Sequence, residues 1–131
     1  MTPSPEGDLH TPRWYPTMIN LPTGQVLVMG GTAGGYTEIF TPGEGWRELT
    51  GIPTSAFSDG TSYPRAWVGN NGDIYTFAPG GGSNNTVELK VLDASGNGSI
   101  RTIGNLPFMT DWTSPAIMYD TGKVLVMASN G

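Results

Sequence analysis

The polar side chains that could do chemistry are few and lie far apart in the sequence. His10 is the single histidine, and with Asp8 it supplies two of the three or four ligands that a metal site normally needs. We therefore expect His10 to be solvated. Asp111 and Asp120 stand alone, and Asp120 falls at a turn, where aspartate is commonly structural. The sequence therefore defines no catalytic pair of carboxylates.

Aromatic side chains supply the other candidates. Tyr15 and Tyr63 are each followed by proline, and a repeated aromatic is more often a structural plug at the inner end of a strand. Arg13 could pair with a carboxylate, hold the Tyr15 ring by a cation–π contact, or form a surface or inter-sheet salt bridge. The tryptophans could stack on sugar rings, but their places on or near expected strands favour packing between sheets. They are Trp14, Trp46, Trp67 and Trp112.

These residues belong to a hairpin pattern that occurs three times. Residues 13–31, RWYPTMINLPTGQVLVMGG, read as two strands joined by a turn and stopped by a glycine pair. Residues 62–81 and 113–131 repeat this design, and the turn glycines Gly24, Gly72 and Gly122 are spaced by 48 and 50 residues. A hairpin period near 50 residues is typical of the kelch type of β-propeller.

Each complete unit contains four expected strands, which is the content of one antiparallel propeller blade. The expected strands are 13–21, 25–29, 36–41 and 46–49 in the first unit, 63–68, 73–77, 87–92 and 99–103 in the second, and 114–119 and 123–127 in the third. We therefore predict an all-β chain with about two and a half four-stranded blades of a seven-bladed ring. A flexible lead-in at residues 1–12 precedes an incomplete propeller at 13–131, with blades at 13–51 and 62–106 and a half blade at 113–131.

The number of blades has a physical consequence. A blade buries its faces against its neighbours, and a ring of six or seven blades needs roughly 300 residues or more. The 131 residues cannot close such a ring, and the third unit stops at Gly131 where its third strand would begin. We expect a piece of a longer protein. The alternative is that several copies complete a ring by self-association through unpaired blade faces.

Composition narrows the class of protein. The 20 glycines, 11 prolines and only 13% charged residues disfavour a helical bundle, and we expect almost no helix. The net charge of −5 argues against nucleic acid as a partner, because no basic face is available. The longest apolar runs, five or six residues, predict no membrane span. The absence of cysteine excludes a disulfide framework within the chain and leaves the compartment open.

Residues 13–31 resemble the galactose oxidase and glyoxal oxidase family of copper-radical oxidases. The resemblance rests on an Arg-Trp-Tyr start, a glycine turn, a second apolar strand and a Gly-Gly stop. These stand here as Arg13-Trp14-Tyr15, Gly24, Val26-Leu27-Val28 and Gly30-Gly31. Residues 63–72 and 114–125 are similar to later blades of glyoxal oxidases in order and spacing. The resemblance covers nearly the whole chain after Pro12.

The resemblance implies a single copper ion held by two tyrosines and two histidines, one tyrosine being cross-linked to a cysteine and oxidised to a radical. That tyrosine maps to Tyr15, which would be both the catalytic residue and a metal ligand. The residue that covers it maps to Ala33, a departure from the family pattern. The cysteine would lie before Met1, and the other ligands after Gly131.

Two functions are expected on this basis. The first is a fragment of a copper-radical oxidase that oxidises small alcohols or aldehydes and reduces O2 to H2O2. The isolated chain should be inactive, because a phenol binds copper well only as phenolate and Tyr15 alone supplies one ligand. The resemblance implies an extracellular or periplasmic parent. The alternative is a non-catalytic kelch-like propeller that binds carbohydrate or protein.

Overall fold

The computed structural model describes residues 7–57, 63–79, 87–111 and 113–128. Within them the chain forms strands and one short 3-10 helix, η1 (Thr54–Phe57). The strands are β1 (Thr17–Asn20), β2 (Val26–Met29), β3 (Tyr36–Thr41), β4 (Gly45–Pro53), β5 (Arg65–Val68), β6 (Ile74–Phe77), β7 (Val87–Asp93), β8 (Ser99–Leu106), β9 (Ala116–Asp120) and β10 (Lys123–Val126). The predicted all-β class is confirmed.

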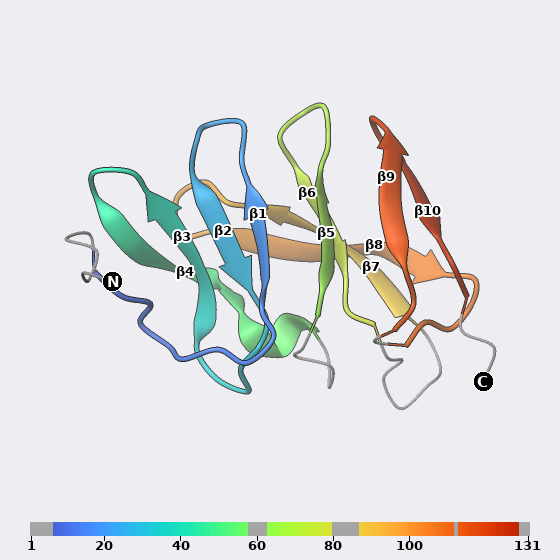
Figure 1. Ribbon diagram of the computed structural model, residues 1–131, viewed down its shortest axis with the longest axis horizontal. Coiled ribbons are helices and arrows are strands. Elements are labelled where there is room, and N and C mark those ends of the chain that lie inside the picture. The colour runs from blue at the N-terminus through green and yellow to red at the C-terminus, as the bar shows by residue number, and fades with distance from the viewer. Residues whose placement is uncertain (1–6, 58–62, 80–86, 112, 129–131) are drawn as a thin grey trace.

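The strands form three antiparallel sheets in chain order. Two are four-stranded, β1-β2-β3-β4 and β5-β6-β7-β8, and β9 pairs with β10. The hairpins β1–β2, β5–β6 and β9–β10 stand side by side with their turns at the same end (Figure 1). Gly24, Gly72 and Gly122 have φ of 83°, 86° and 74° in these turns. Glycine tolerates this left-handed conformation, which explains its recurrence at these positions.

The first strand of each four-stranded sheet begins later than the sequence predicts. Tyr15 and Tyr63 have φ of 57° and 55°, which interrupts the extended backbone that was expected from residues 13 and 63 onward. The fourth strands are longer than predicted. Register shifts at Tyr36/Thr37 and at Leu89/Lys90 let β4 and β8 stay paired beyond the predicted strand ends at residues 49 and 103.

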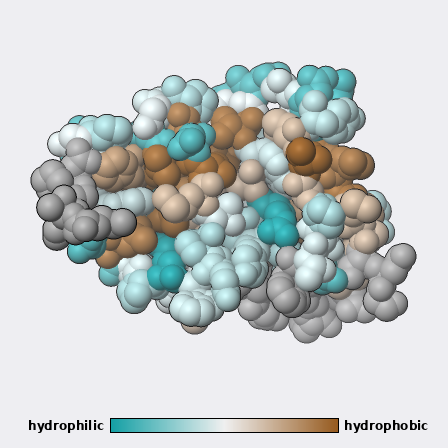
Figure 2. All heavy atoms as spheres, in the orientation of Figure 1, coloured by the Kyte–Doolittle hydropathy of each residue, from teal (hydrophilic) through white to brown (hydrophobic). Residues whose placement is uncertain are grey.

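The core lies between the two four-stranded sheets. It consists of Phe57 from η1 and of apolar side chains that both sheets turn toward each other, among them Leu27, Met29, Ile39, Leu49, Ile52, Ile74 and Leu92. The backbones also meet, because Gly51 N donates to Asn97 O at 2.8 Å. Phe57 in η1 is buried, so the connection between the two four-stranded sheets contributes to the core. Apolar atoms reach the surface over β9 (Figure 2).

Candidate functional site

Tyr15 lies in the segment that leads into β1, and half of its surface is exposed, 51%. Its ring stacks on Tyr63, with centroids 4.9 Å apart and planes at 25°. Trp14 meets Tyr15 edge-on at 5.2 Å. A left-handed conformation is uncommon outside glycine and costs of order 1–3 kcal/mol, so the surrounding contacts must enforce it at both tyrosines.

Backbone contacts fix the conformation at Tyr15. Trp14 N donates to Gly31 O at 2.6 Å, and Tyr63 N donates to Tyr15 O at 3.2 Å. A Cβ atom on Gly31 would lie 2.8 Å from Trp14 O, so only glycine allows this approach. The glycine pair that reads as a strand stop thus also makes room for the segment that carries Tyr15.

The buried side chain of Arg13 holds the segment around Tyr15 against the first sheet. Its guanidinium is 2.8 Å from Glu38 Oε1, and the exposures of the two side chains are 1% and 0%. Arg13 also donates to Gly30 O and Tyr36 O. The ion pair is therefore buried within the first sheet. Of the alternatives for Arg13, the pairing with a carboxylate is the one observed, and this pair is neither at the surface nor between sheets.

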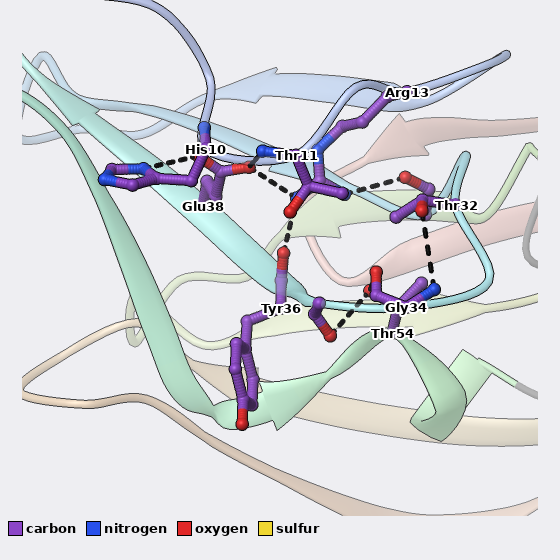
Figure 3. A network of polar contacts seen from close by, with 10 residues as sticks. His10, Thr11, Arg13, Thr32, Gly34, Tyr36, Glu38 and Thr54 are labelled. Carbon is purple, nitrogen blue, oxygen red and sulfur yellow. Dashed lines mark hydrogen bonds and ion pairs between the residues drawn. The ribbon is translucent and has the colours of Figure 1, made fainter.

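Residues before Arg13 complete the shell around Glu38 (Figure 3). His10 N donates to Glu38 Oε2 at 2.8 Å and Thr11 N donates to Oε1 at 3.4 Å. The His10 ring remains half exposed, but its Nδ1 is 3.0 Å from Glu38 Oε2. The expected solvation of His10 is therefore only partly right. Flexibility of the lead-in at 1–12 stays a prediction, and residues 1–6 lie outside the described residues.

The pKa of Glu38 lies below its usual range. Burial alone would raise it, but hydrogen bonds from Arg13 and His10 and the charge of Arg13 outweigh burial. Glu38 is therefore a structural carboxylate without a proton to donate. The pKa of Tyr63 is raised, first by loss of solvent around the phenol and then by Tyr15. Tyr63 therefore stays neutral at physiological pH.

Copper of the expected kind does not fit the described residues by themselves. They contain no group of three or more His, Cys, Asp or Glu side chains that could hold a metal ion. The one histidine of the sequence, His10, rests on Glu38. Tyr15 is accessible and could supply one oxygen ligand. Its ring is stacked on Tyr63, whereas Ala33, the position expected to cover it, has no aromatic ring. Tyr63 holds the place of Tyr15 in the second repeat, and this equivalence is the feature of the sequence that could have indicated the contact between the two rings.

The remaining candidates have structural roles or differ from expectation. Trp14 is 73% exposed, so the packing predicted for it is wrong. Trp46 and Trp67 pack against Phe40 and Phe77 of their own sheets. Trp112 lies outside the described residues.

The two isolated acids serve turns. Asp111 Oδ1 accepts from Thr113 N, and Asp120 Oδ2 pairs with Lys123 at 2.9 Å. The structural role predicted for Asp120 is what its contacts indicate.

No family model and no curated protein matches the sequence. Within the described ranges, none of the helical residues forms a stretch of the length and apolarity that crossing a membrane would take.

Proposed function

We propose that the three sheets are consecutive blades of a kelch-type β-propeller, and that the chain contributes Tyr15 to a copper-radical oxidase of the galactose oxidase and glyoxal oxidase type. The propeller assignment is supported by contacts that recur between neighbouring sheets. Thr17 Oγ1 donates to Pro64 O, and Arg65, which stands in the same place one repeat later, donates to Ser114 O at 3.1 Å.

The exposure of Tyr15 carries the functional proposal. A structural plug is buried on all sides, whereas Tyr15 presents half of its surface to solvent from a fixed, left-handed backbone. Such strained, over-determined positions cluster at active sites. Copper, when bound, would supply the electron transfer for oxidising an alcohol or aldehyde and reducing O2 to H2O2. Tyr15 would offer its phenol oxygen, Tyr63 would cover the ring, and Arg13 would hold the backbone in place.

The test uses the complete reading frame around these residues, expressed with copper. We expect production of H2O2 from a small aldehyde such as glyoxal or a primary alcohol such as galactose. Tyr15→Phe should lower this to the background rate and reduce bound copper. Tyr119→Phe, an exposed tyrosine on β9, is the matched control and should keep both. Full activity in Tyr15→Phe, or a protein that takes up no copper, would refute the proposal.

A non-catalytic propeller that binds carbohydrate is the second candidate, favoured by the exposed Trp14 beside Tyr15. Exposed aromatic faces suit sugar rings. In a protein without oxidase activity, galactose-containing oligosaccharides should then quench tryptophan fluorescence, and Trp14→Ala should abolish the quenching.

A further inference from the structure

A hollow of about 510 Å³ lies between the second sheet and the β9–β10 hairpin. Trp67, Leu89 and Ile103 line one wall, and Met118, Val124 and Val126 line the other. Ile103 is 41% exposed although it lies among apolar side chains. An apolar hollow of this size on a protein surface points to a missing partner.

The first two sheets indicate what fills the equivalent space. Aligning the turn glycines Gly72 and Gly122 places β10 on β6. In the second sheet, β6 pairs onward with β7, with Ile74 opposite Leu92 and Thr76 opposite Lys90. The β7–β8 hairpin then covers the first sheet, where Leu92 is buried in the shared core and Ile100 packs against it.

In the part of the chain that the structure describes, β10 has no onward neighbour of this kind. Among the described residues it pairs with β9 alone, and its outer edge has no strand beside it. The segment from Lys123 to Ala128 contains no proline, and only Lys123 is charged. An edge of this kind is a template for adding a strand.

A repeated arginine marks the far end of the same site. Arg47 stands opposite Ile39 in the first sheet, and its guanidinium donates to Gly96 O, in the turn between β7 and β8, at 2.6 Å. Arg101 stands opposite Val91, the same place in the second sheet, and is exposed. An equivalent hairpin on β10 would bring a turn carbonyl to Arg101.

We propose that the hollow, the free edge of β10 and Arg101 together form a docking site for a β-hairpin with the chemistry of β7–β8. Its first strand adds to β10, alternate apolar side chains enter the hollow, and its glycine-containing turn offers a carbonyl to Arg101. The occupant is a hairpin distinct from those that the described residues form. The docking site rests on the blade repeat of the proposed function and not on the role of Tyr15, so the docking site and the oxidase activity can fail separately.

The probe is a synthetic peptide with the sequence of residues 87–106. Val87 and Leu106 are cross-strand partners, so added terminal cysteines joined by a disulfide hold the peptide as a hairpin. The peptide is titrated into the full 131-residue chain and followed by amide NMR shifts and hydrogen exchange. We expect saturable binding, with shifts and exchange protection concentrated in β10 and around Leu89.

Three variants locate the site. Ile103→Asp should weaken binding by about tenfold or more, because it places a charge in the hollow. Arg101→Ala should weaken it by a smaller factor and leaves the apolar surface unchanged. Met18→Asp, at an exposed position on the distant β1, is the matched control and should bind as the unmodified chain does.

Several results would overturn the proposal. They are an absence of peptide binding to the folded chain, equal binding of a scrambled peptide, and equal binding by Ile103→Asp. The proposed occupant would also be wrong if the chain alone formed a dimer of twice 13.8 kDa that Ile103→Asp dissociated, because a second copy would then fill the hollow.

Discussion

Glu38 is a carboxylate with no exposed surface that nevertheless keeps its charge, because Arg13 and the backbone of His10 and Thr11 hydrogen-bond to both of its oxygens. Burying a charge is costly unless it is paired in this way. The pairing ties the segment before Tyr15 to β3. At the residue scale, the position of the candidate site therefore depends on a carboxylate that takes no part in chemistry.

Glu38 should make the stability of the chain depend on acid pH. Its pKa is lower in the folded than in the unfolded state, so between the two values the unfolded state binds more protons and the free energy of unfolding rises with pH. The stabilisation is complete above about pH 4.3, the ordinary pKa of glutamate, and is lost as pH falls through the lower folded pKa. Urea unfolding at several pH values between 7 and 3 measures this.

Glu38→Gln is the control for this effect. At pH 7 the variant should be less stable by about 1–3 kcal/mol, because its amide leaves buried donors without an acceptor. The difference should shrink as the pH falls. Asp93 and Asp120 also have lowered pKa values, through Ser95 and Lys123, but both are exposed and should contribute less. A constant difference between variant and wild type at every pH would show that Glu38 is not the titrating group.

The sequence could identify Tyr15 and Arg13 as candidate site residues, but it could not predict which residues surround them. The partner of Arg13, Glu38, lies 25 residues away on β3. The alternating pattern there predicts a strand, but it does not show which face of that strand the N-terminal segment covers. The left-handed backbone at Tyr15 and Tyr63 has no local signal, because tyrosine before proline ordinarily favours an extended conformation.

At the scale of elements, the close approach of β4 to the second sheet depends on Gly51, a residue type that usually interrupts strands. A Cβ atom on Gly51 would lie 1.9 Å from Gly98 O. The sheets approach this closely only because no side chain stands between their backbones. Gly104 on β8 is also within a strand, but a Cβ atom there would meet nothing within 4 Å. The contact between the sheets therefore requires glycine at position 51, whereas no neighbouring atom requires it at position 104.

This difference predicts opposite results for two alanine substitutions. Gly51→Ala should lower the free energy of unfolding by about 1–3 kcal/mol, because the sheets must move apart. Gly104→Ala should leave it unchanged or raise it by roughly 0.5–1 kcal/mol, because alanine restricts the unfolded chain more than glycine does. Urea denaturation of both variants provides the comparison. Equal effects would mean that the two sheets are not in backbone contact at Gly51.

At the scale of the whole molecule, the hairpin period predicted three repeats, and the repeats place equivalent side chains in unequal surroundings. Leu27 and Leu125 occupy the same place beside the aligned turn glycines. Leu27 is fully buried by the second sheet, whereas Leu125 is 57% exposed, together with Ile117 and Met127 on the same face. The sequence could not reveal this contrast, because it depends on which sheet follows.

The exposed face of β9–β10 should make the isolated chain associate as its concentration rises, because the equivalent apolar face of the first sheet is covered by the sheet that follows it. Leu125→Lys should reduce the association, measured by sedimentation velocity over a range of concentrations, and change the free energy of unfolding by no more than about 0.5 kcal/mol. Leu27→Lys is the matched substitution at the equivalent position, and it should unfold the chain because it buries an unpaired charge in the core. If Leu125→Lys associates as strongly as the wild type, this face is not the surface through which copies meet. If Leu27→Lys stays folded, the two positions are not equivalent and the repeat does not govern how the sheets pack.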